Sequence, residues 1–289
     1  MRRLFAVFMV LLLIAGMLCM AGCNEEEAQL TVSEGVLTVS LSPDFAPMEF
    51  VDTSKSGQEQ YVGVDVKLAQ AIADEMGLGL VIKPMSFEAC QSAVLGGAVD
   101  MSISGYAYTE ERAQKFLISD FYKPEEFEEL HMIVVRSEDV DKYKTAEDFG
   151  GVAVGAQASS IQLDLCHEDL PDNTEVVEYA GIDGAIQALK EGKIEGVAVA
   201  DGRGEIEIEN SDGELAASGF YFEWDDKATE NIVLMQKGRE DLAAYVNKVI
   251  AAKTESGELH QWYEECSDLA KSENAKNVVY DEKGEETGE

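Results

Sequence analysis

VLTVSL (36–41) and GVDVKLAQAIADEMG (63–77) lie close together near the start of the chain and set its architecture. The first segment alternates apolar and polar residues, which predicts a β-strand. The second repeats apolar residues on one helical face, with Asp65 as a candidate N-cap and Gly77 as a candidate terminator. A strand followed by an amphipathic helix is the repeating unit of an α/β protein.

The same order of strand and helix recurs along the chain and then restarts. Ser86 and Thr109 are expected to cap two further helices. Further strands are expected at LVIKPM (80–85), VDMSIS (99–104), HMIVV (131–135), GVAVG (151–155), EGVAVA (195–200) and NIVLMQ (231–236). Such repeats predict two lobes around a cleft, each a mainly parallel sheet flanked by helices. Ligands bind at the carboxyl ends of such strands, which singles out the loops 42–50 and 104–112.

The N-terminal segment MRRLFAVFMVLLLIAGMLCMAGC (1–23) has the features of a secretory signal peptide, with two arginines, an apolar run and small residues before Cys23. Its end resembles the lipobox of bacterial lipoproteins, in which the cysteine becomes the lipidated first residue, although Met20 stands where leucine is usual. We expect residues 1–22 to be removed and Cys23 to carry lipid. An uncleaved membrane anchor is the alternative, and the apolar run is short for one.

Both ends of the mature chain are polar. Residues 23–33 are acidic and lack periodicity, which predicts a flexible tether between the lipid and the folded part. Residues 270–289 are polar and acidic and are expected to be disordered. The folded part is therefore expected between about residues 34 and 267.

The composition narrows the classes of partner and of chemistry. Asp and Glu number 57 against 22 Lys and Arg, which gives a formal net charge of −35 and argues against nucleic acid as a partner. Signatures of hydrolases, nucleotide-binding loops and zinc sites do not occur in the sequence, and its three histidines are far apart. We therefore expect neither a metal nor a cofactor.

The five cysteines form no CxxC pair and no disulfide framework. Once Cys19 is lost with the signal peptide and Cys23 is lipidated, Cys90, Cys166 and Cys266 remain. Cys90 lies in an apolar helical segment, where a small buried side chain is the ordinary interpretation. A bridge between Cys90 and Cys266 stays open as an alternative.

Three motifs occur in a fixed order: VLTVSLSPDFAPMEF (36–50), YVGVDVKLAQAIADEMG (61–77) and SFEACQSAVLGGAVDMSISGYAYTEERAQKFLISDFY (86–122). Together they resemble the family 3 extracellular solute-binding proteins, the amino-acid-binding components of ABC importers. The resemblance runs from about residue 35 to 267, is strong through residue 122 and is weaker after residue 200. No single tripeptide is decisive, so the series as a whole carries the resemblance.

This resemblance implies a two-lobed periplasmic-binding-protein fold of type II. Lobe 1 would comprise residues 34–123 plus 231–267, and lobe 2 residues 127–226. The hinge would cross near residues 122–126 and 227–230. Ligand would bind between the lobes, favour their closure and so present both lobes to a membrane permease.

On the resemblance, Arg112 in SGYAYTEER grips the carboxylate of the ligand, because a planar guanidinium meets two oxygens at once. A surface arginine paired with a neighbouring glutamate is the alternative. Ser104 and the Gly105 backbone stand where the family donates hydrogen bonds to the same carboxylate. Ala107 departs from the family, in which serine or threonine often adds a hydroxyl at this position, and this puts a standard α-amino acid ligand in doubt.

Two aromatic residues match cleft positions of the family. Phe45, in a proline-flanked loop, would pack over the ligand side chain, and Phe87 would form a second wall. Ordinary core packing is the alternative for both residues, because aromatic side chains are mostly core residues.

On lobe 2, GAQASS (155–160) matches the strand-to-helix turn of the family. Ser159 and Ser160 would begin a helix and hold a carboxylate, or they would only cap it. Asp201 is the candidate for the acid that pairs with the ligand ammonium, although it lies one position later than usual and Ala200 takes the expected place.

Two functions of different class follow. The first is the extracytoplasmic, lipid-anchored binding component of an ABC importer, a monomer that captures an amino acid and delivers it to a permease. The alternative is an enzyme resembling cyclohexadienyl dehydratases on the same scaffold, with Glu49, Glu88 or Asp201 as candidate acids or bases. Ser42 stands near a position where binders of cationic amino acids often have an acid, so a polar, neutral amino acid fits marginally better. Compensation by Asp44, Glu49 or Asp201 stays open as an alternative.

Overall fold

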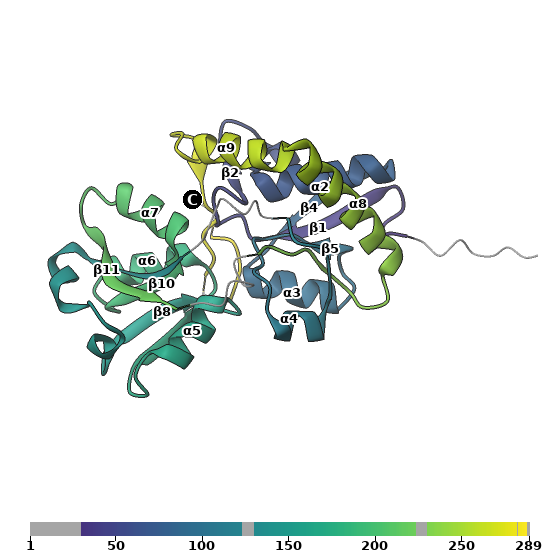
Figure 1. The fold of residues 1–289 in the computed structure, drawn as a ribbon. Coiled ribbons are helices and arrows are strands. Elements are labelled where there is room, and N and C mark those ends of the chain that lie inside the picture. Colours follow the sequence, from purple (N-terminus) through teal and green to yellow (C-terminus); the bar gives the residue numbers. More distant parts are fainter. Residues whose placement is uncertain (1–29, 123–129, 224–229, 282, 288–289) are drawn as a thin grey trace, which may run out of the picture. The chain divides into compact units, whose positions relative to one another are not determined.

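The structure, a computed structural model, describes residues 30–122, 130–223, 230–281 and 283–287 (Figure 1). The signal peptide, Cys23 and most of the expected tether lie outside the described residues, as do most of the two expected hinge crossings. Within the described ranges, no helix is long and apolar enough to cross a membrane. The chain is divided between a first lobe with one five-stranded sheet and a second lobe with another.

The sheet of lobe 1 has the strand order β4-β1-β5-β12-β6. Strands β4, β1 and β5 run parallel, and β12 runs antiparallel to both β5 and β6. Their bounds are β1 Val36–Leu41, β4 Gly79–Pro84, β5 Met101–Ser102, β6 Leu117–Ile118 and β12 Leu234–Met235. Because β12 comes from residues after lobe 2, the chain returns to lobe 1 to complete its first sheet.

Helices cover both faces of this sheet, as Figure 1 shows for α2 and α8 on one side and α3 on the other. Their bounds are α2 Val64–Met76, α3 Phe87–Leu95, α4 Glu110–Lys115, α8 Glu240–Ser256 and α9 Glu258–Ala270. The left-handed Gly77 ends α2 as expected, but the N-cap is Gly63 and not Asp65. A Cβ at Gly63 would lie 2.1 Å from the carbonyl oxygen of Met48, so only glycine allows this close approach.

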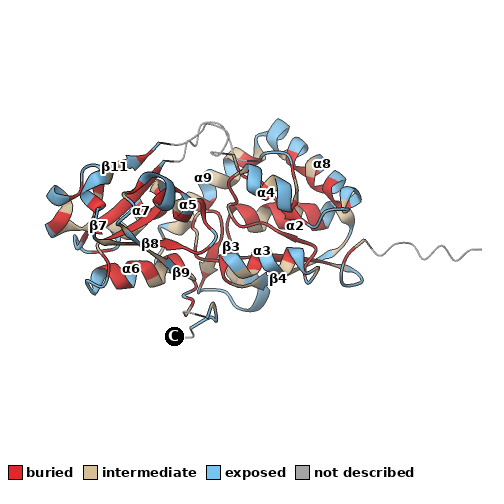
Figure 2. Ribbon diagram, turned by 90° about the horizontal axis from the view of Figure 1, so that it is seen from below, coloured by how far each residue is buried: buried red, intermediate tan, exposed pale blue. Residues whose placement is uncertain are grey.

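The sheet of lobe 2 has the strand order β11-β7-β10-β8-β9. Its strands are β7 His131–Arg136, β8 Ala153–Gln157, β9 Glu175–Tyr179, β10 Gly196–Ala200 and β11 Leu215–Phe222. The helices are α5 Ile161–Asp169, α6 Ile182–Lys190 and α7 Asp201–Glu209. Two short 3₁₀ segments, η2 Ser137–Lys142 and η3 Ala146–Phe149, connect β7 to β8. Buried residues follow the strands and the inward faces of the helices (Figure 2).

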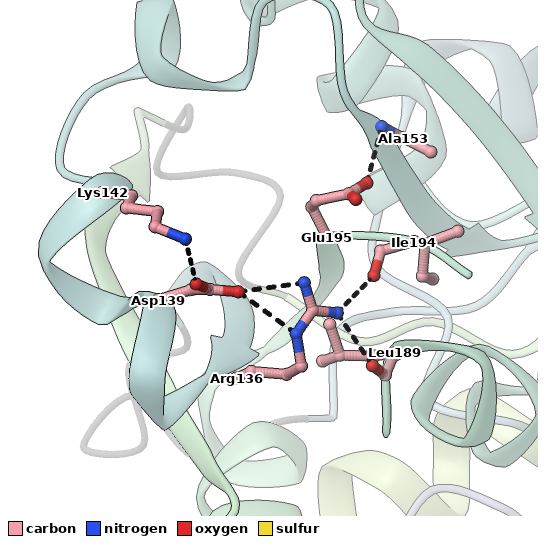
Figure 3. Close-up of polar contacts among 7 residues, drawn as sticks. All are labelled: Arg136, Asp139, Lys142, Ala153, Leu189, Ile194 and Glu195. Carbon is pink, nitrogen blue, oxygen red and sulfur yellow. Dashed lines mark hydrogen bonds and ion pairs between the residues drawn. The ribbon is translucent and has the colours of Figure 1, made fainter. Parts of the chain in front are cut away.

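A polar cluster in lobe 2 joins the end of β7 and η2 to the end of α6 and the segment before β10 (Figure 3). The Arg136 guanidinium donates to the carbonyl oxygens of Leu189 and Ile194 at 3.0 and 2.8 Å. The Asp139 carboxylate accepts from Arg136 and is also paired with Lys142. Leu189 lies in the last turn of α6 and Ile194 in the segment that leads into β10, so Arg136 ties the end of α6 to the sheet.

The expectation of mainly parallel sheets is confirmed: four of the five described strands in each sheet run in the same direction, and one strand runs against them. Each five-stranded sheet has two parallel and two antiparallel pairings within the described residues. The antiparallel pairings involve β12 in lobe 1 and β7 in lobe 2. Both strands begin after the chain has changed lobe, so no helical crossover in the same sheet forces them to be parallel.

Helix α7 is an element that sequence patterns did not predict. Its sequence DGRGEIEIE contains two glycines and an alternating EIEIE, which by themselves favour a loop or a strand. A Cβ at Gly204 would lie 2.2 Å from the terminal methyl of Met132, so glycine lets α7 pack closely on the sheet. Tertiary packing therefore overrides the local preference.

The two ends of the folded part also differ from expectation. Asp100 accepts from the backbone N–H of Val32 at 2.7 Å, so the last residues of the expected tether are packed on lobe 1. Residues 271–281 and 283–287, expected to be disordered, contain strand β13 Ala275–Lys276, which extends a small sheet of β2 Phe50–Asp52 and β3 Tyr61–Val62. Val278 and Tyr280 are buried, which explains why this acidic segment is ordered. The 3₁₀ segment η1 Gly57–Gln60 precedes β3.

The three remaining thiols, Cys90, Cys166 and Cys266, are free and buried. No bridge joins Cys90 to Cys266 in this structure. Burial raises the pKa of Cys90 and of Cys166 to about 12, which keeps both thiols protonated and unreactive at neutral pH.

Candidate functional site

A pocket lies between lobe 1 and lobe 2. Its enclosed free volume is about 40 Å³, within a hollow of about 530 Å³ that includes open solvent. Both loops expected to carry the site contribute lining residues. Lobe 1 contributes Phe45, Phe87, Ser104, Gly105, Ala107 and Arg112. Lobe 2 contributes His131, Gln157, Ser160, Ile161, Gln162, Ile182, Ala198, Val199 and Ala200.

Arg112 lies in the pocket and is held there by local structure. Thr109 caps α4 by accepting from the backbone N–H of Arg112 at 3.0 Å, which orients the first turn of this short helix. The Arg112 guanidinium donates to the carbonyl oxygen of Ala107 at 2.7 Å and to that of Ser159, in lobe 2, at 3.1 Å. The side chain is therefore a bridge between the lobes and not an exposed helix residue.

The charge of Arg112 has no carboxylate partner among the described residues. Its guanidinium carbon lies 5.7 Å from the centre of the Phe87 ring and 5.4 Å from that of Tyr106. Burial lowers the pKa of Arg112 from its usual value, because a cation loses hydration there. Carbonyl oxygens and aromatic rings compensate only part of this cost, so an anion entering the pocket would be stabilised.

Ser104 and Gly105 form the floor of the pocket, but their donors are already in use. The Ser104 hydroxyl donates to Glu49 at 2.6 Å, and the Gly105 N–H donates to Asp65 at 2.7 Å. Gly105 has φ +55°, and a Cβ there would lie 2.7 Å from the Phe45 ring. The turn therefore requires glycine, and its hydrogen bonds serve the fold in this arrangement.

Two buried acids lie beneath this turn. Burial and then the Asp65 charge raise the pKa of Glu49 well above its usual value. Burial also raises the pKa of Asp65 to about 6, although Gly105 and Tyr122 donate hydrogen bonds to its carboxylate. Since Glu49 has the fewer donors, we assign the shared proton to Glu49, which makes the pair a supporting network for the turn.

The start of α5 forms the opposite wall. Ser160 is the N-cap, and its hydroxyl accepts from the Leu163 N–H at 3.2 Å, as the capping interpretation expected. Ile161 and Gln162 also line the pocket, so the positive end of the helix dipole faces the same space as Arg112. Ser159 does not line the pocket, and it contributes the carbonyl oxygen that accepts from Arg112.

The two aromatic residues take different places. Phe45 is half-buried and packs against the cores of both lobes, so it lies at the border between them. Phe87 is buried in a core cluster and its ring packs against Tyr106 with 4.8 Å between centroids. Phe87 therefore combines the core role and the wall role that the sequence had left as alternatives.

Asp201 does not line the pocket, whereas its neighbour Ala200 does. The carboxylate of Asp201 accepts from the Gly202 N–H at 2.8 Å at the start of α7. The one-residue displacement visible in the sequence thus turns this acid away from the lining. We find no physical support in the described residues for Asp201 as the partner of a ligand ammonium.

Sequence reasoning missed a polar cluster beside the pocket. The Asp44 carboxylate accepts from Gln157 at 2.9 Å and from the Ile182 N–H at 3.4 Å, and the Asp44 carbonyl oxygen accepts from Arg203 at 3.0 Å. Burial, and then the Asp183 charge, raise the pKa of Asp44 to about 7. The only signal in the sequence was an acid in the proline-flanked loop 42–50.

Comparisons with known proteins identify the family to which the chain is similar. The model of the bacterial extracellular solute-binding proteins, family 3, matches residues 37–266. The arginine-binding extracellular protein ArtP of Bacillus subtilis is 27% identical over 257 residues, which cover 87% of this chain and 94% of ArtP. The L-cystine-binding protein TcyJ of Escherichia coli is 24% identical over 258 residues, which cover 89% of this chain and 92% of TcyJ.

Solved structures agree with this assignment. The amino acid ABC transporter substrate-binding protein AbpA of Streptococcus pneumoniae, bound to L-arginine, is 33% identical with a TM-score of 0.74, covering 83% of this chain and 98% of its own. An ancestral arginine-binding protein bound to glutamine is 27% identical with a TM-score of 0.70, covering 81% and 98%. The chain therefore belongs to the bacterial extracellular solute-binding proteins, family 3.

Proposed function

We propose that the protein captures a free amino acid in the interlobe pocket and delivers it to the permease of an ABC importer. The observation that carries the proposal is Arg112, a buried cation that faces the pocket without a described carboxylate partner. Relatives named for binding arginine or cystine support an amino-acid ligand. A second candidate, an enzyme of the dehydratase type, has no comparable observation in its favour.

The ligand carboxylate would lie between Arg112 and the start of α5. A guanidinium offers paired donors, and the N–H groups of Ile161 and Gln162 belong to a helical turn that has no acceptors of its own. The two lobes would thus hold one carboxylate from opposite sides. Ligand binding would stabilise the contact between the lobes by this route.

The lining favours a polar ligand side chain. Gln157, Gln162 and His131 line lobe 2, and no Asp or Glu is among the lining residues that the structure describes. A cationic side chain would therefore meet amide groups and not a carboxylate. We propose a polar, uncharged amino acid first and arginine second, since solved relatives are bound to glutamine and to L-arginine.

A thermal-shift screen of residues 24–289 tests this proposal. The compounds are the twenty amino acids, cystine, ornithine and prephenate, each at several concentrations. A ligand that binds only the folded state raises the melting temperature by mass action. A shift with one or a few amino acids is expected. A shift with prephenate together with its turnover would support the dehydratase alternative, and no shift with any amino acid would contradict the proposal.

We also propose that the protein works as a monomer anchored by lipid at Cys23 on the outer side of the cytoplasmic membrane. The lipobox-like end of residues 1–23 supports the anchor. The Cys23→Ser variant should leave the membrane fraction, and membrane association as strong as that of the natural chain would contradict lipidation there. Light scattering of residues 24–289 should give the mass of one chain.

A further inference from the structure

The described residues 271–281 and 283–287, here called the C-terminal strap, lie outside the range that the family model matches, which ends at residue 266. The strap contacts lobe 1 at several points. Ala275 and Lys276 pair with β2, and the Val278 N–H donates to the Pro43 carbonyl oxygen at 2.9 Å. Further along, Gly284 lies against the Ser86 side chain. The strap is thus bound to both the β2 edge and the start of α3.

The strap also contacts lobe 2. Tyr280 is 5% exposed, and its Cδ2 lies 3.3 Å from where a Cβ of Gly181 would stand. Its carbonyl oxygen lies 3.9 Å from the corresponding point on Gly184 in α6. Both positions are glycines, which have no Cβ, so the ring and backbone of Tyr280 can pack closely against the start of α6.

Tyr280 is therefore held between the lobes. Burial, and then the Asp44 charge, raise the pKa of its phenol, which also lies beside the Ser42 hydroxyl. Asp44 and Gly181 are chain neighbours of the pocket residues Phe45 and Ile182. The Tyr280 ring thus packs against Gly181, the residue that precedes the pocket residue Ile182.

The outer half of the strap keeps Tyr280 in place. Val278 and Tyr280 are buried while Val279 between them is 40% exposed, which is the alternation of a strand. The chain then turns at Asp281, and the Thr287 N–H donates to the Val279 carbonyl oxygen at 2.8 Å. Tyr280 also forms a β-bridge with Glu286. The side chain is positioned by a hairpin and is not a loose end.

We propose that the C-terminal strap is an interlobe clasp, in which Tyr280 stabilises the contact between the lobes and so slows the release of ligand. A segment bound to both lobes favours the arrangement in which both surfaces are available to it. Removal of the clasp should open the ligand-free protein. Removal should also weaken ligand binding by a factor in the range of about 5 to 150 that is typical of coupled sites.

The test compares Tyr280→Ala with Val279→Ala, an adjacent strap variant whose side chain is exposed. Small-angle X-ray scattering of the ligand-free proteins measures the radius of gyration, and circular dichroism checks that each variant is folded. We expect a larger radius for Tyr280→Ala and an unchanged radius for Val279→Ala. Truncation after Ser272 should act in the same direction. Equal radii for Tyr280→Ala, the truncated chain and the natural chain would overturn the proposal.

The second measurement uses L-arginine and L-glutamine as probes, and this part rests on the proposed function. Stopped-flow dissociation should be faster in Tyr280→Ala by the factor given above, and Tyr280→Phe should behave like the natural chain because the ring makes the interlobe contact. Tighter binding in Tyr280→Ala would mean that Tyr280 competes with ligand, which contradicts a clasp. If neither probe binds the natural chain, that result counts against the proposed amino-acid ligand. The radii of gyration of the ligand-free proteins then test the clasp by themselves.

Discussion

Two arginines are buried where the lobes meet, and their surroundings differ. The Arg203 side chain is fully buried and pairs with Asp183 at 3.1 Å and also with Glu207, while it donates to the Asp44 backbone. Arg112 is buried to a similar degree, yet its described partners are two carbonyl oxygens and two aromatic rings. Arg203 thus forms ion pairs with acids of the chain, whereas Arg112 forms none among the described residues and is influenced by Asp164 and Glu111 only from a greater distance.

This difference separates a structural site from a binding site. A buried cation is costly unless an anion is close to it. Arg203 meets that condition within the chain and needs no ligand. Arg112 would meet it once an anion entered the pocket, and on our proposal the ligand, not the fold, supplies that partner.

The largest expected effect is on stability, in the Arg203→Ala variant. Removal of the guanidinium leaves Asp183 and Glu207 as close like charges in a largely buried place, which costs about 3–5 kcal/mol of the free energy of unfolding. Urea denaturation measures the change. Lys115→Ala is the control, since Lys115 pairs with Glu111 on the surface and should contribute less than about 1 kcal/mol. If Arg203→Ala lost as little free energy of unfolding as the control, the proposed contrast between Arg203 and Arg112 would be wrong.

The Arg112→Ala variant should show the opposite pattern. Ligand affinity should fall by about 2–5 kcal/mol, or roughly 30- to 4000-fold, because a charge-assisted pair in a desolvated pocket is lost. The free energy of unfolding without ligand should stay the same or rise, since no anion in the described chain loses its partner. Calorimetry with the amino acid found in the screen measures the first quantity, and urea denaturation the second.

Two results would indicate that Arg112, like Arg203, has a structural role and not a ligand-binding one. Affinity equal to that of the natural chain would exclude Arg112 from the carboxylate site. A large loss of stability without ligand would show that its bonds to Ala107 and Ser159 hold the lobes by themselves. Lys115→Ala again serves as the control, because it removes a charge from the same helix at an exposed position.

Local signals in the sequence predicted most of the fold. Gly77 ends α2 and Thr109 caps α4 because these preferences depend on a few neighbouring residues. The start of α2 at Gly63 depends on the Met48 backbone, which local patterns do not contain. The sequence did not predict that residues 271–281 and 283–287 are structured, for the same reason: their acidic composition hid Val278 and Tyr280, which pack against distant surfaces.

The candidate site likewise contains residues that the sequence predicted and residues that it did not. The order of the motifs singled out Arg112, Ser104 and Gly105, and all three line the pocket. The cluster at Asp44 joins residues that are 113 and 159 positions apart in the chain, so no spacing rule could find Gln157 or Arg203. That Ser104 and Gly105 donate to internal acids also depends on contacts formed only in the fold.

The remaining prediction is a pH dependence of stability that distinguishes the two regions again. The unfolded chain loses the Asp44 proton near pH 3.8, and the folded protein keeps it until about pH 7, because burial disfavours the charged form. The folded state therefore binds more protons between these values. The free energy of unfolding should fall as the pH rises from about 4 to about 7.

Glu49 and Asp65, beneath the Arg112 pocket, have raised pKa values and contribute with the same sign. Urea denaturation at several pH values measures how steeply the free energy of unfolding falls with pH. The fall should be shallower in Asp44→Asn if Asp44 contributes most to it, and shallower in Glu49→Gln if Glu49 contributes most. We expect the larger change in Glu49→Gln, because the Glu49 carboxyl has another acid beside it whereas Arg203 opposes the charge cost at Asp44. A slope unchanged in both variants would mean that neither buried acid is protonated in the folded protein. The acids beneath the Arg112 pocket would then be charged, and the contrast between the two arginine regions would be lost.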